Sequence, residues 1–442
     1  MYQFPKNLYT DVRIENVTNT EIKLSNHELQ KNKTQKEVGA MIRIYDGIRW
    51  YYKATSDVEH IQEAINELAQ MATPNEKVAE CPEIARLEVN KDKVMIFKDH
   101  SFVAVPNEEK VALIKRYDEL TKVDERIQSA DSIYLDCYTH KHFVSSLGAD
   151  VEFDDQYARV IFLLNILDQG IPNHFHEHFN AKSFEDIAKY DEWVKEHIAA
   201  NLEFAQKAVP VEPGDYVCVM SPSVTGVFAH ESFGHKSESD FMLNDETMKK
   251  EWEIGKKVGS DILSITDDGG MMVHGYTPYD DEGCKAKKTY LVKNGILEGR
   301  LHSALTAACI GEELTGNARA LNFEYEPVVR MTNTMVEPGT MSKEELFADI
   351  ELGIYIHDWK HGSGMSSFTI APSKSYMIRN GKIAEPVRVS VVTGNVMETL
   401  YLIDAVSKDL QTDAGSCGKM EQMGLPVAMG GPYTRVRKLN VQ

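Results

Sequence analysis

The segment GDYVCVMSPSVTGVFAHESFGHKSESD, residues 214–240, contains the signals that decide the fold of the C-terminal half of the chain. Its first part, GDYVCVM, is rich in β-branched and aromatic residues, which favours a strand. Ser221 is then typical of a helix N-cap, and Pro222 of the first turn of a helix. The pattern predicts a strand followed by a helix over about residues 222–239.

This expected helix contains His230, Glu231 and His235, one residue more than the His-Glu-x-x-His arrangement of zinc hydrolases. On a regular α-helix, positions i and i+5 point about 140° apart, so the two histidines would face different directions. They are then polar residues on a solvated face, unless the helix breaks or contains one wide turn with an i→i+5 hydrogen bond. Gly234 lowers the steric cost of such a distortion.

A catalytic zinc ion needs three protein ligands and one open position for water. The sequence offers two candidates for the third ligand. Glu238 follows His235 by three residues, and Cys417 lies in DAGSCGKMEQ, which we expect to be a glycine-flanked loop. A thiolate with two imidazoles suits zinc, whereas a buried structural thiol is the commonest role of a free cysteine.

Proline clusters and capping signals divide the chain into an N-terminal strand–helix region (1–75), a central α/β region (97–209) and a C-terminal domain (210–442). The expected fold class is α+β. Antiparallel strands and helices make up the first two regions, and a mostly antiparallel β domain carries the metal-binding helix.

Local signals predict the individual elements of these regions. Asp46-Gly47 between two apolar runs predicts a hairpin with positive φ at both turn positions. Ser56 and Glu59 form a capping-box pattern before an amphipathic helix over 57–71. The other expected elements are a helix over 108–122 capped by Asn107, strands over 127–167, a helix over 183–208, and hairpins at Asn294-Gly295 and Asn380-Gly381.

The composition argues against several classes of function and location. The 442 residues have a net charge of -20, which argues against nonspecific binding to nucleic acid or to anionic lipid. No signal-peptide pattern occurs at the N-terminus, and the most apolar run, VIFLLNIL (160–167), is too short to span a bilayer. The six cysteines are scattered along the chain, which favours a reducing cytoplasm over a disulfide framework.

Other histidines are clustered but have no supporting ligand pattern. His174, His176 and His178 alternate in HFHEHF and would share one face of a strand, although Pro172 and Asn173 indicate a turn. No carboxylate or thiolate stands at a fitting spacing, so a structural role is favoured. The same reasoning applies to the pairs His140/His142 and His357/His361, the latter in a glycine-containing loop.

Five segments in order resemble the TldD/PmbA family, the "modulator of DNA gyrase" metallopeptidases. The first is HESFGHKSESD, similar to the HExxxH signature of that family. The others are YDDEGCKAKKTYLVKNGILEG (279–299), LTGNARA (314–320), RMTNTMVEPG (330–339) and CGKMEQ (417–422). The resemblance covers most of residues 10–440. The chain starts almost at the first strand, where relatives commonly begin with a helix.

The resemblance implies a zinc-dependent peptidase that acts on peptides or unfolded segments. It assigns the metal to His230, His235 and Cys417, with Glu231 as the general base. It also implies a dimer, either with itself or with a PmbA-like subunit that lacks the motif. Because this chain keeps the motif, it resembles the catalytic TldD type.

Three further residues receive secondary roles in this hypothesis. Glu238 would accept a hydrogen bond from a ligand histidine. Asn317 and Arg319 would contact peptide carbonyls or a terminal carboxylate, with a structural role as the alternative. Two rival functions stay open: a cysteine hydrolase that uses Cys417 with a histidine base, and a non-catalytic binding subunit stabilised by zinc.

Overall fold

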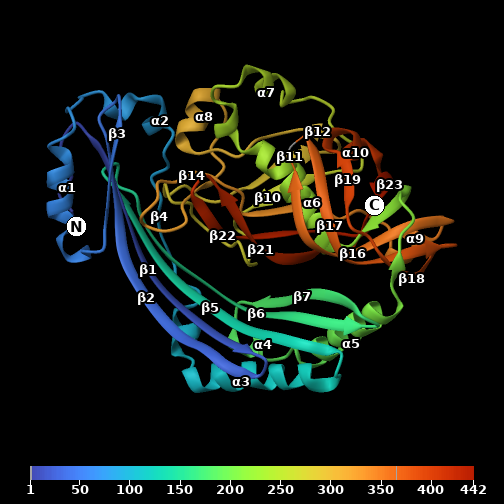
Figure 1. Ribbon diagram of the computed structural model, residues 1–442. Coiled ribbons are helices and arrows are strands. Elements are labelled where there is room, and N and C mark those ends of the chain that lie inside the picture. The colour runs from blue at the N-terminus through green and yellow to red at the C-terminus, as the bar shows by residue number, and fades with distance from the viewer. Residues whose placement is uncertain (1, 365) are drawn as a thin grey trace.

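The computed structural model describes residues 2–364 and 366–442. It confirms an α+β fold with mainly antiparallel sheets. A long curved sheet from the N-terminal half lies beneath the C-terminal domain, with helices α3, α4 and α5 on its outer side (Figure 1). The concave face of the sheet is therefore turned toward the C-terminal domain.

The curved sheet has seven strands in the order β3-β2-β1-β5-β6-β4, and β7 also pairs with β6. The sheet joins the N-terminal strands to those of the central region through the β1–β5 pair. Burial alternates along β6, so one face of this strand packs on helices and the other faces the C-terminal domain. The bounds are β1 Tyr9–Ser25, β2 Glu28–Tyr45, β3 Trp50–Thr55, β4 Lys91–Val94, β5 Ile127–Ser145, β6 Asp150–Asp168 and β7 Ile171–Ala181.

The predicted hairpin at Asp46-Gly47 is present, but its turn is longer than expected. Tyr45 pairs with Trp50, so four residues form the loop, and only Gly47 has a positive φ, of 96°. The Asp46 carboxylate accepts hydrogen bonds from the backbone N–H groups of Ile48 and Arg49. This side-chain cap replaces the tight two-residue turn that the sequence suggested.

The helices expected over 57–71, 108–122 and 183–208 are present with different ends, and the short helix α2 was not predicted. The predicted Ser56/Glu59 capping box is wrong, because a 3₁₀ turn from Val58 to His60 precedes α1 without a side-chain cap. Asn107 is the first residue of α3 and does not cap it. The single helix expected over 183–208 is two helices. The bounds are α1 Ile61–Ala69, α2 Pro82–Ala85, α3 Asn107–Glu119, α4 Phe184–Ile187 and α5 Asp191–Lys207.

The C-terminal domain packs two sheets around α6, Pro222–Ala229. One sheet has the order β12-β11-β10-β15-β22-β21, and the other contains β16-β9-β23-β19-β17-β18-β8 with β20 beside β23. The bounds of the first are β10 Ile265–Asp268, β11 Lys288–Lys293, β12 Ile296–Leu297, β15 Asn333–Val336, β21 Gln411–Lys419 and β22 Gln422–Gly431. Those of the second are β8 Val209–Pro210, β9 Gly214–Met220, β16 Leu352–Gly364, β17 Ser367–Arg379, β18 Lys382–Arg388, β19 Val392–Asn395, β20 Ile403–Val406 and β23 Thr434–Val441.

Helix α6 is buried along almost its whole length, unlike an amphipathic surface helix. Gly226 permits this close packing, since a Cβ atom there would lie 2.4 Å from the backbone nitrogen of Gly430 on β22. The short elements around this core are α7 Glu246–Glu251, α8 Ala304–Ile310, β13 Ala318–Arg319, β14 Val328–Val329, α9 Lys343–Phe347 and α10 Val396–Leu402.

Both predicted Asn-Gly hairpins are confirmed. Asn294-Gly295 joins β11 to β12, and Asn380-Gly381 joins β17 to β18. All four residues have positive φ, between 49° and 76°, as a two-residue turn of this kind requires. Within the described residues, no helix has the length and apolar character needed to cross a membrane.

Candidate metal centre

The strand and helix expected over the opening segment are present, and the helix contains the wide turn that aligned histidines require. The Ser221 hydroxyl accepts a hydrogen bond from the Val224 N–H and caps α6. After Ala229 the backbone forms a π-helical turn, His230–Gly234, in which the His235 N–H donates to the His230 carbonyl. A 3₁₀ turn, His235–Ser237, ends the segment. The two imidazole rings are 5.0 Å apart at an interplanar angle of 80°.

Gly234 has a role that differs from the expected one. Its φ of -56° is ordinary for a helix, so the turn does not depend on the conformational freedom of glycine. A Cβ atom at this position would instead lie 2.0 Å from the sulfur of Met331. The absence of a side chain therefore lets the wide turn pack against a buried methionine.

Cys417 comes from the opposite end of the domain sequence and meets both histidines. Its Sγ lies 3.7 Å from His235 Nε2, and the candidate ligand atoms of His230, His235 and Cys417 all lie within 4.8 Å of one another. Cys417 lies in strand β21, and not in a loop as predicted. The register of β21 against β22 shifts between Cys417 and Gly418, where a bulge interrupts the ladder.

The two histidines change the acidity of the thiol. Burial by itself raises the pKa of Cys417, but the hydrogen bonds and positive charge of His230 and His235 outweigh it and lower the pKa to about 5. Burial also opposes protonation of His235, yet Cys417 and Glu238 outweigh it and raise the His235 pKa to about 10. The thiolate, which is the metal-binding form of cysteine, is therefore favoured at neutral pH.

Glu238 lies behind His235 and not among the three clustered groups. One of its carboxylate oxygens is 3.3 Å from His235 Nδ1, and the same oxygen is 3.1 Å from Lys419 Nζ. Burial raises the pKa of Glu238, but His235 and Lys419 outweigh it and lower the pKa. Lys419 also contacts Asp240 at 2.7 Å, so a buried network fixes the orientation of the His235 ring.

Glu231 lies on the π-helical turn beside His230 and faces a cleft between α6, the curved sheet and strands β16 and β21. The cleft has a volume of about 620 Å³. Two glycines of β16 let this strand pass close to the turn. A Cβ atom at Gly364 would lie 2.9 Å from the Glu231 carbonyl oxygen, and one at Gly362 would lie 3.4 Å from Glu231 Cγ.

Asn317 and Arg319 contact backbone carbonyls of the protein itself. The Asn317 amide donates to the Arg330 carbonyl at 3.0 Å. Arg319 donates to the carbonyls of Met331 and Pro426, at 2.6 and 2.9 Å. These contacts agree with the structural alternative for both residues.

The other histidines do not gather into a metal cluster among the described residues. His174, His176 and His178 do share one face of β7, but the turn expected at Pro172 and Asn173 is wrong, because both residues belong to the strand. His174 bonds to Asn165, and His178 bonds to Asp413 at 2.8 Å. The remaining pairs also lie in strands. His140 and His142 are in β5, where they contact Glu152 and Asp150. His357 and His361 are in β16, where a loop was expected.

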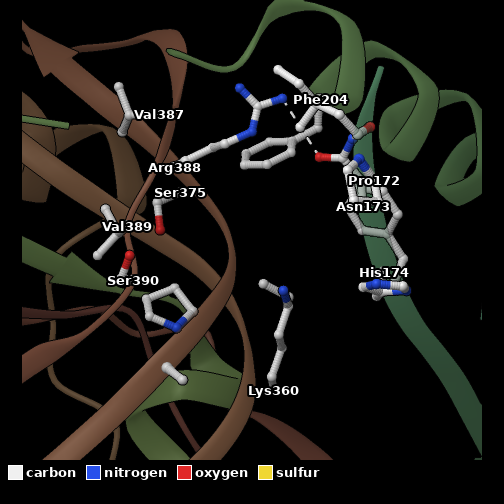
Figure 2. Close-up of a pocket in the computed structure, with 15 residues that line it drawn as sticks. Pro172, Asn173, His174, Phe204, Lys360, Ser375, Val387, Arg388, Val389 and Ser390 are labelled. Atoms are coloured by element: carbon white, nitrogen blue, oxygen red, sulfur yellow. Dashed lines mark hydrogen bonds between the residues drawn. The ribbon is translucent and has the colours of Figure 1, made fainter. Parts of the chain in front are cut away.

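A second, smaller cavity of about 280 Å³ adjoins the cleft and shares Lys360 with it. Figure 2 shows side chains of β7 and α5 facing those of β17, β18 and the segment after β18 across this space. Arg388 spans it and donates to the Ala205 carbonyl at 2.9 Å and to Asn173 Oδ1 at 3.5 Å. These contacts connect the two halves of the molecule.

An α+β fold that brings two histidines and a cysteine together, with a carboxylate in a neighbouring cleft, offers ligand types that proteins use to hold a metal ion. The chain belongs to the PmbA/TldA metallopeptidase family. Models of domain 1, the central domain and the C-terminal domain of this family match residues 10–72, 101–202 and 213–442.

Individual relatives agree with this assignment. A metalloprotease from Methanocaldococcus jannaschii is 30% identical over 97% of this chain and 95% of its own length. A zinc metalloprotease TldD homolog from Saccharolobus solfataricus is 28% identical over 98% of this chain and 96% of its own length. The crystal structure of a Thermotoga maritima protein, described as a modulator of a DNA gyrase, shares the fold, with a TM-score of 0.80 and 22% identity over 98% of this chain and 96% of that chain.

Sequence reasoning missed Arg159 and Asp413, which line the cleft away from Glu231. Arg159 stands on β6 between a half rich in acidic residues and the apolar run 160–167, and no local pattern distinguishes it from the other charged residues of this strand. Asp413 lies four residues before Cys417 on β21, and only the fold places it beside His178.

Proposed function

We propose that this protein is a zinc-dependent peptidase that hydrolyses peptides or unfolded protein segments. His230, His235 and Cys417 would hold the ion, and Glu231 would act as the general base. The observation that carries the proposal is the meeting of three ligand side chains, created by a π-helical turn and a distant strand, beside a carboxylate that faces a cleft.

The side chains fit zinc in number, type and spacing. Two ligands of a tetrahedral zinc ion, one sulfur and one nitrogen, lie about 3.6 Å apart, given the usual bond lengths. The separation of 3.7 Å between Cys417 Sγ and His235 Nε2 agrees with this value. The candidate ligand atoms of all three side chains lie within 4.8 Å of one another, so one ion could contact all of them.

The residues around the ion have separate tasks. When bound, zinc would make hydroxide available near neutral pH and polarise the scissile carbonyl. Glu231 would accept the proton of the attacking water and deliver it to the leaving amine. Glu238 would hold the Nδ1–H of His235, which leaves Nε2 free for the metal. An extended substrate would bind along an exposed strand edge by main-chain hydrogen bonds.

The test of this proposal is the Glu231→Gln variant, assayed for zinc content and for cleavage of unfolded peptides by mass spectrometry. It should keep one equivalent of zinc and lose about 10²–10⁴-fold in kcat, because the ligands stay while the base is removed. Substantial remaining turnover would show that another group acts as the base.

A cysteine hydrolase is the second candidate, and the contact between Cys417 and His235 favours it. The thiol is buried, however, and Glu231, not Cys417, borders the cleft. Stoichiometric zinc in the purified protein would reject this candidate. A third possibility, a zinc-stabilised binding subunit without activity, would be supported by bound zinc with no cleavage of any unfolded peptide.

The assembly and the compartment are part of the proposal. By resemblance to its family, the chain would act in the cytoplasm as a dimer, with itself or with a subunit that lacks the HExxxH motif. Light scattering of the purified protein tests the first arrangement, since a homodimer has twice the mass of the chain. A monomer that becomes active only with the second subunit would support the other arrangement.

A further inference from the structure

The cleft extends well beyond Glu231, along two elements that run side by side. Helix α6 and strand β21 meet at one end through Ser223 and Asp413, whose side chains hydrogen-bond at 2.6 Å. At the other end the turn after α6 meets Cys417. Eight helical residues rise about 12 Å, and four strand residues span about 13 Å. The Ser223–Asp413 end therefore lies about 12 Å from the metal ligands, the length of three to four residues of extended peptide.

Arg159 lines the cleft near this distant end. It lies on β6, two residues before Ile161, which pairs with His178 on β7. Its Nε atom is buried and has no hydrogen-bond partner within residues 2–364 and 366–442. Burial lowers the pKa of this guanidinium, and the charge of Asp413 only partly offsets the effect. The arginine therefore has a largely desolvated charge, and its Nε–H has no acceptor among the residues that the structure describes.

Other interior arginines donate through their terminal nitrogens, even where Nε is unpartnered, as in Arg13, Arg300 and Arg330. Arg43 forms ion pairs with Asp11 and Glu282. Arg319 and Arg330 donate to backbone carbonyls. Arg159 differs from these arginines because its orphaned Nε is not accompanied by an acceptor at its terminal nitrogens among the described residues, and a buried polar group in this state needs an explanation such as a ligand.

The acidic groups near Arg159 already have partners. Asp413 accepts hydrogen bonds from His178 and Ser223 through its two oxygens. Glu177, which follows His176 on β7, forms an ion pair of 2.5 Å with Lys374. This end of the cleft therefore has free donors for an anion. Lys360 also lines the cleft, but it is exposed and borders the smaller cavity as well, so it serves as a charge-matched control for Arg159.

We propose that Arg159 forms a carboxylate-binding subsite of the cleft, which holds the C-terminal carboxylate of a peptide substrate three to four residues beyond the scissile bond. A guanidinium binds a carboxylate through two parallel charge-assisted hydrogen bonds, and the desolvated position of Arg159 strengthens them. The subsite deepens the proposed peptidase function and rests on it for the position of the scissile bond. An acidic side chain near the end of the peptide offers the same chemistry.

The experiment measures binding without turnover, so that it does not depend on the peptidase activity. The zinc-loaded Glu231→Gln protein is titrated with a fluorescent unstructured peptide that has a free C-terminal carboxylate. Two further peptides are titrated in the same way. One is the same peptide with a C-terminal amide, and the other is a C-terminal amide whose last residue is glutamate. Each is repeated with Arg159→Gln, Arg159→Lys and the control Lys360→Gln in the same background.

The free acid should bind at least about tenfold more tightly than the plain amide. Arg159→Gln should abolish this difference, Arg159→Lys should restore part of it, and Lys360→Gln should keep most of it. Binding of the glutamate amide as tight as the free acid would assign the subsite to acidic side chains as well. Equal affinity of acid and amide, or a difference that survives in Arg159→Gln with unchanged thermal stability, would overturn the subsite.

A cleavage assay with the wild-type enzyme separates the two hypotheses. The subsite predicts products shortened by three or four C-terminal residues, whatever the length of the peptide. Absence of any cleavage, together with the Arg159-dependent binding difference, would reject the peptidase function and leave the subsite in place. Cleavage at scattered positions, with no preference for a free carboxylate, would support the peptidase function and reject the subsite.

Discussion

His230 and His235 converge on one thiolate, whereas the histidines of β7 do not share a ligand. On β7 the alternation of His174, His176 and His178 places the rings on one face, but His174 and His178 bond to different partners, Asn165 and Asp413. In the π-helical turn the spacing is less regular, yet the rings meet Cys417. A close spacing of histidines is therefore a weaker sign of a metal site than a backbone distortion that aims them at a third ligand.

Among the variants that test this contrast between the two groups of histidines, Cys417→Ser should have the largest effect on zinc binding. Loss of a partner outside the ligand set already weakens zinc binding about 10–100-fold, so loss of the thiolate should weaken it by more than about 100-fold. Metal analysis after dialysis against a chelator measures the effect. Cys309→Ser, which changes an exposed thiol, is the control. If zinc stays stoichiometric in Cys417→Ser, Glu238 becomes the better third ligand.

Gly234→Ala tests whether the wide turn depends on its packing against Met331. The added Cβ would lie 2.0 Å from the methionine sulfur, and overpacking of this kind costs about 1–3 kcal/mol. The higher helix propensity of alanine returns only about 1 kcal/mol, so the variant should unfold at a lower temperature and bind zinc more weakly. Gly214→Ala, where the nearest atom is at 3.5 Å, is the matched control. Equal unfolding temperatures and equal zinc affinities of the two variants would contradict the role of Gly234 in packing the wide turn against Met331.

Glu238→Gln should reduce zinc affinity about 10–100-fold while the protein keeps its fold, because glutamine preserves the shape but not the charge that holds His235. Competition with a chromogenic chelator measures the change. Glu246→Gln, an exposed glutamate on α7 that pairs with Lys249, should have no effect. An unchanged affinity in Glu238→Gln would mean that the His235 ring is held by packing alone.

The smallest effect is expected for His174→Ala on β7. It removes a single exposed contact with Asn165, so zinc stoichiometry should stay the same and the free energy of unfolding should change by less than about 0.5 kcal/mol. Loss of one zinc equivalent per chain in this variant would show that β7 also holds an ion, and that the contrast between the two groups of histidines is wrong.

The sequence predicted those parts of the structure that depend on local signals. The Asn-Gly hairpins and the Ser221 cap follow from backbone preferences of a few residues. The spacing of His230 and His235 left a wide turn and a break of the helix both open, and the structure contains the wide turn. The ends of helices were less predictable, because Asn107 and Ser56 compete with tertiary packing.

The cleft could not be predicted, because its walls come from segments far apart in the sequence. Asp413 lies beside His178 only after the curved sheet packs against the C-terminal domain. Cys417, one of the two candidate third ligands, lies near both histidines in the structure. It was expected in a loop because of its flanking glycines, but it belongs to strand β21, where the register shifts after it. Arg159 has no local motif at all, and its lack of an acceptor is visible only in the folded protein.

Zinc-edge X-ray absorption of the purified holoprotein tests the central claim most directly, because it reports the atoms bound to the metal. The account predicts one sulfur ligand at about 2.3 Å and nitrogen ligands at about 2.0–2.1 Å, with the sulfur signal absent in Cys417→Ser. A first shell of nitrogen and oxygen alone, or one with more than one sulfur, would contradict the His230, His235 and Cys417 site.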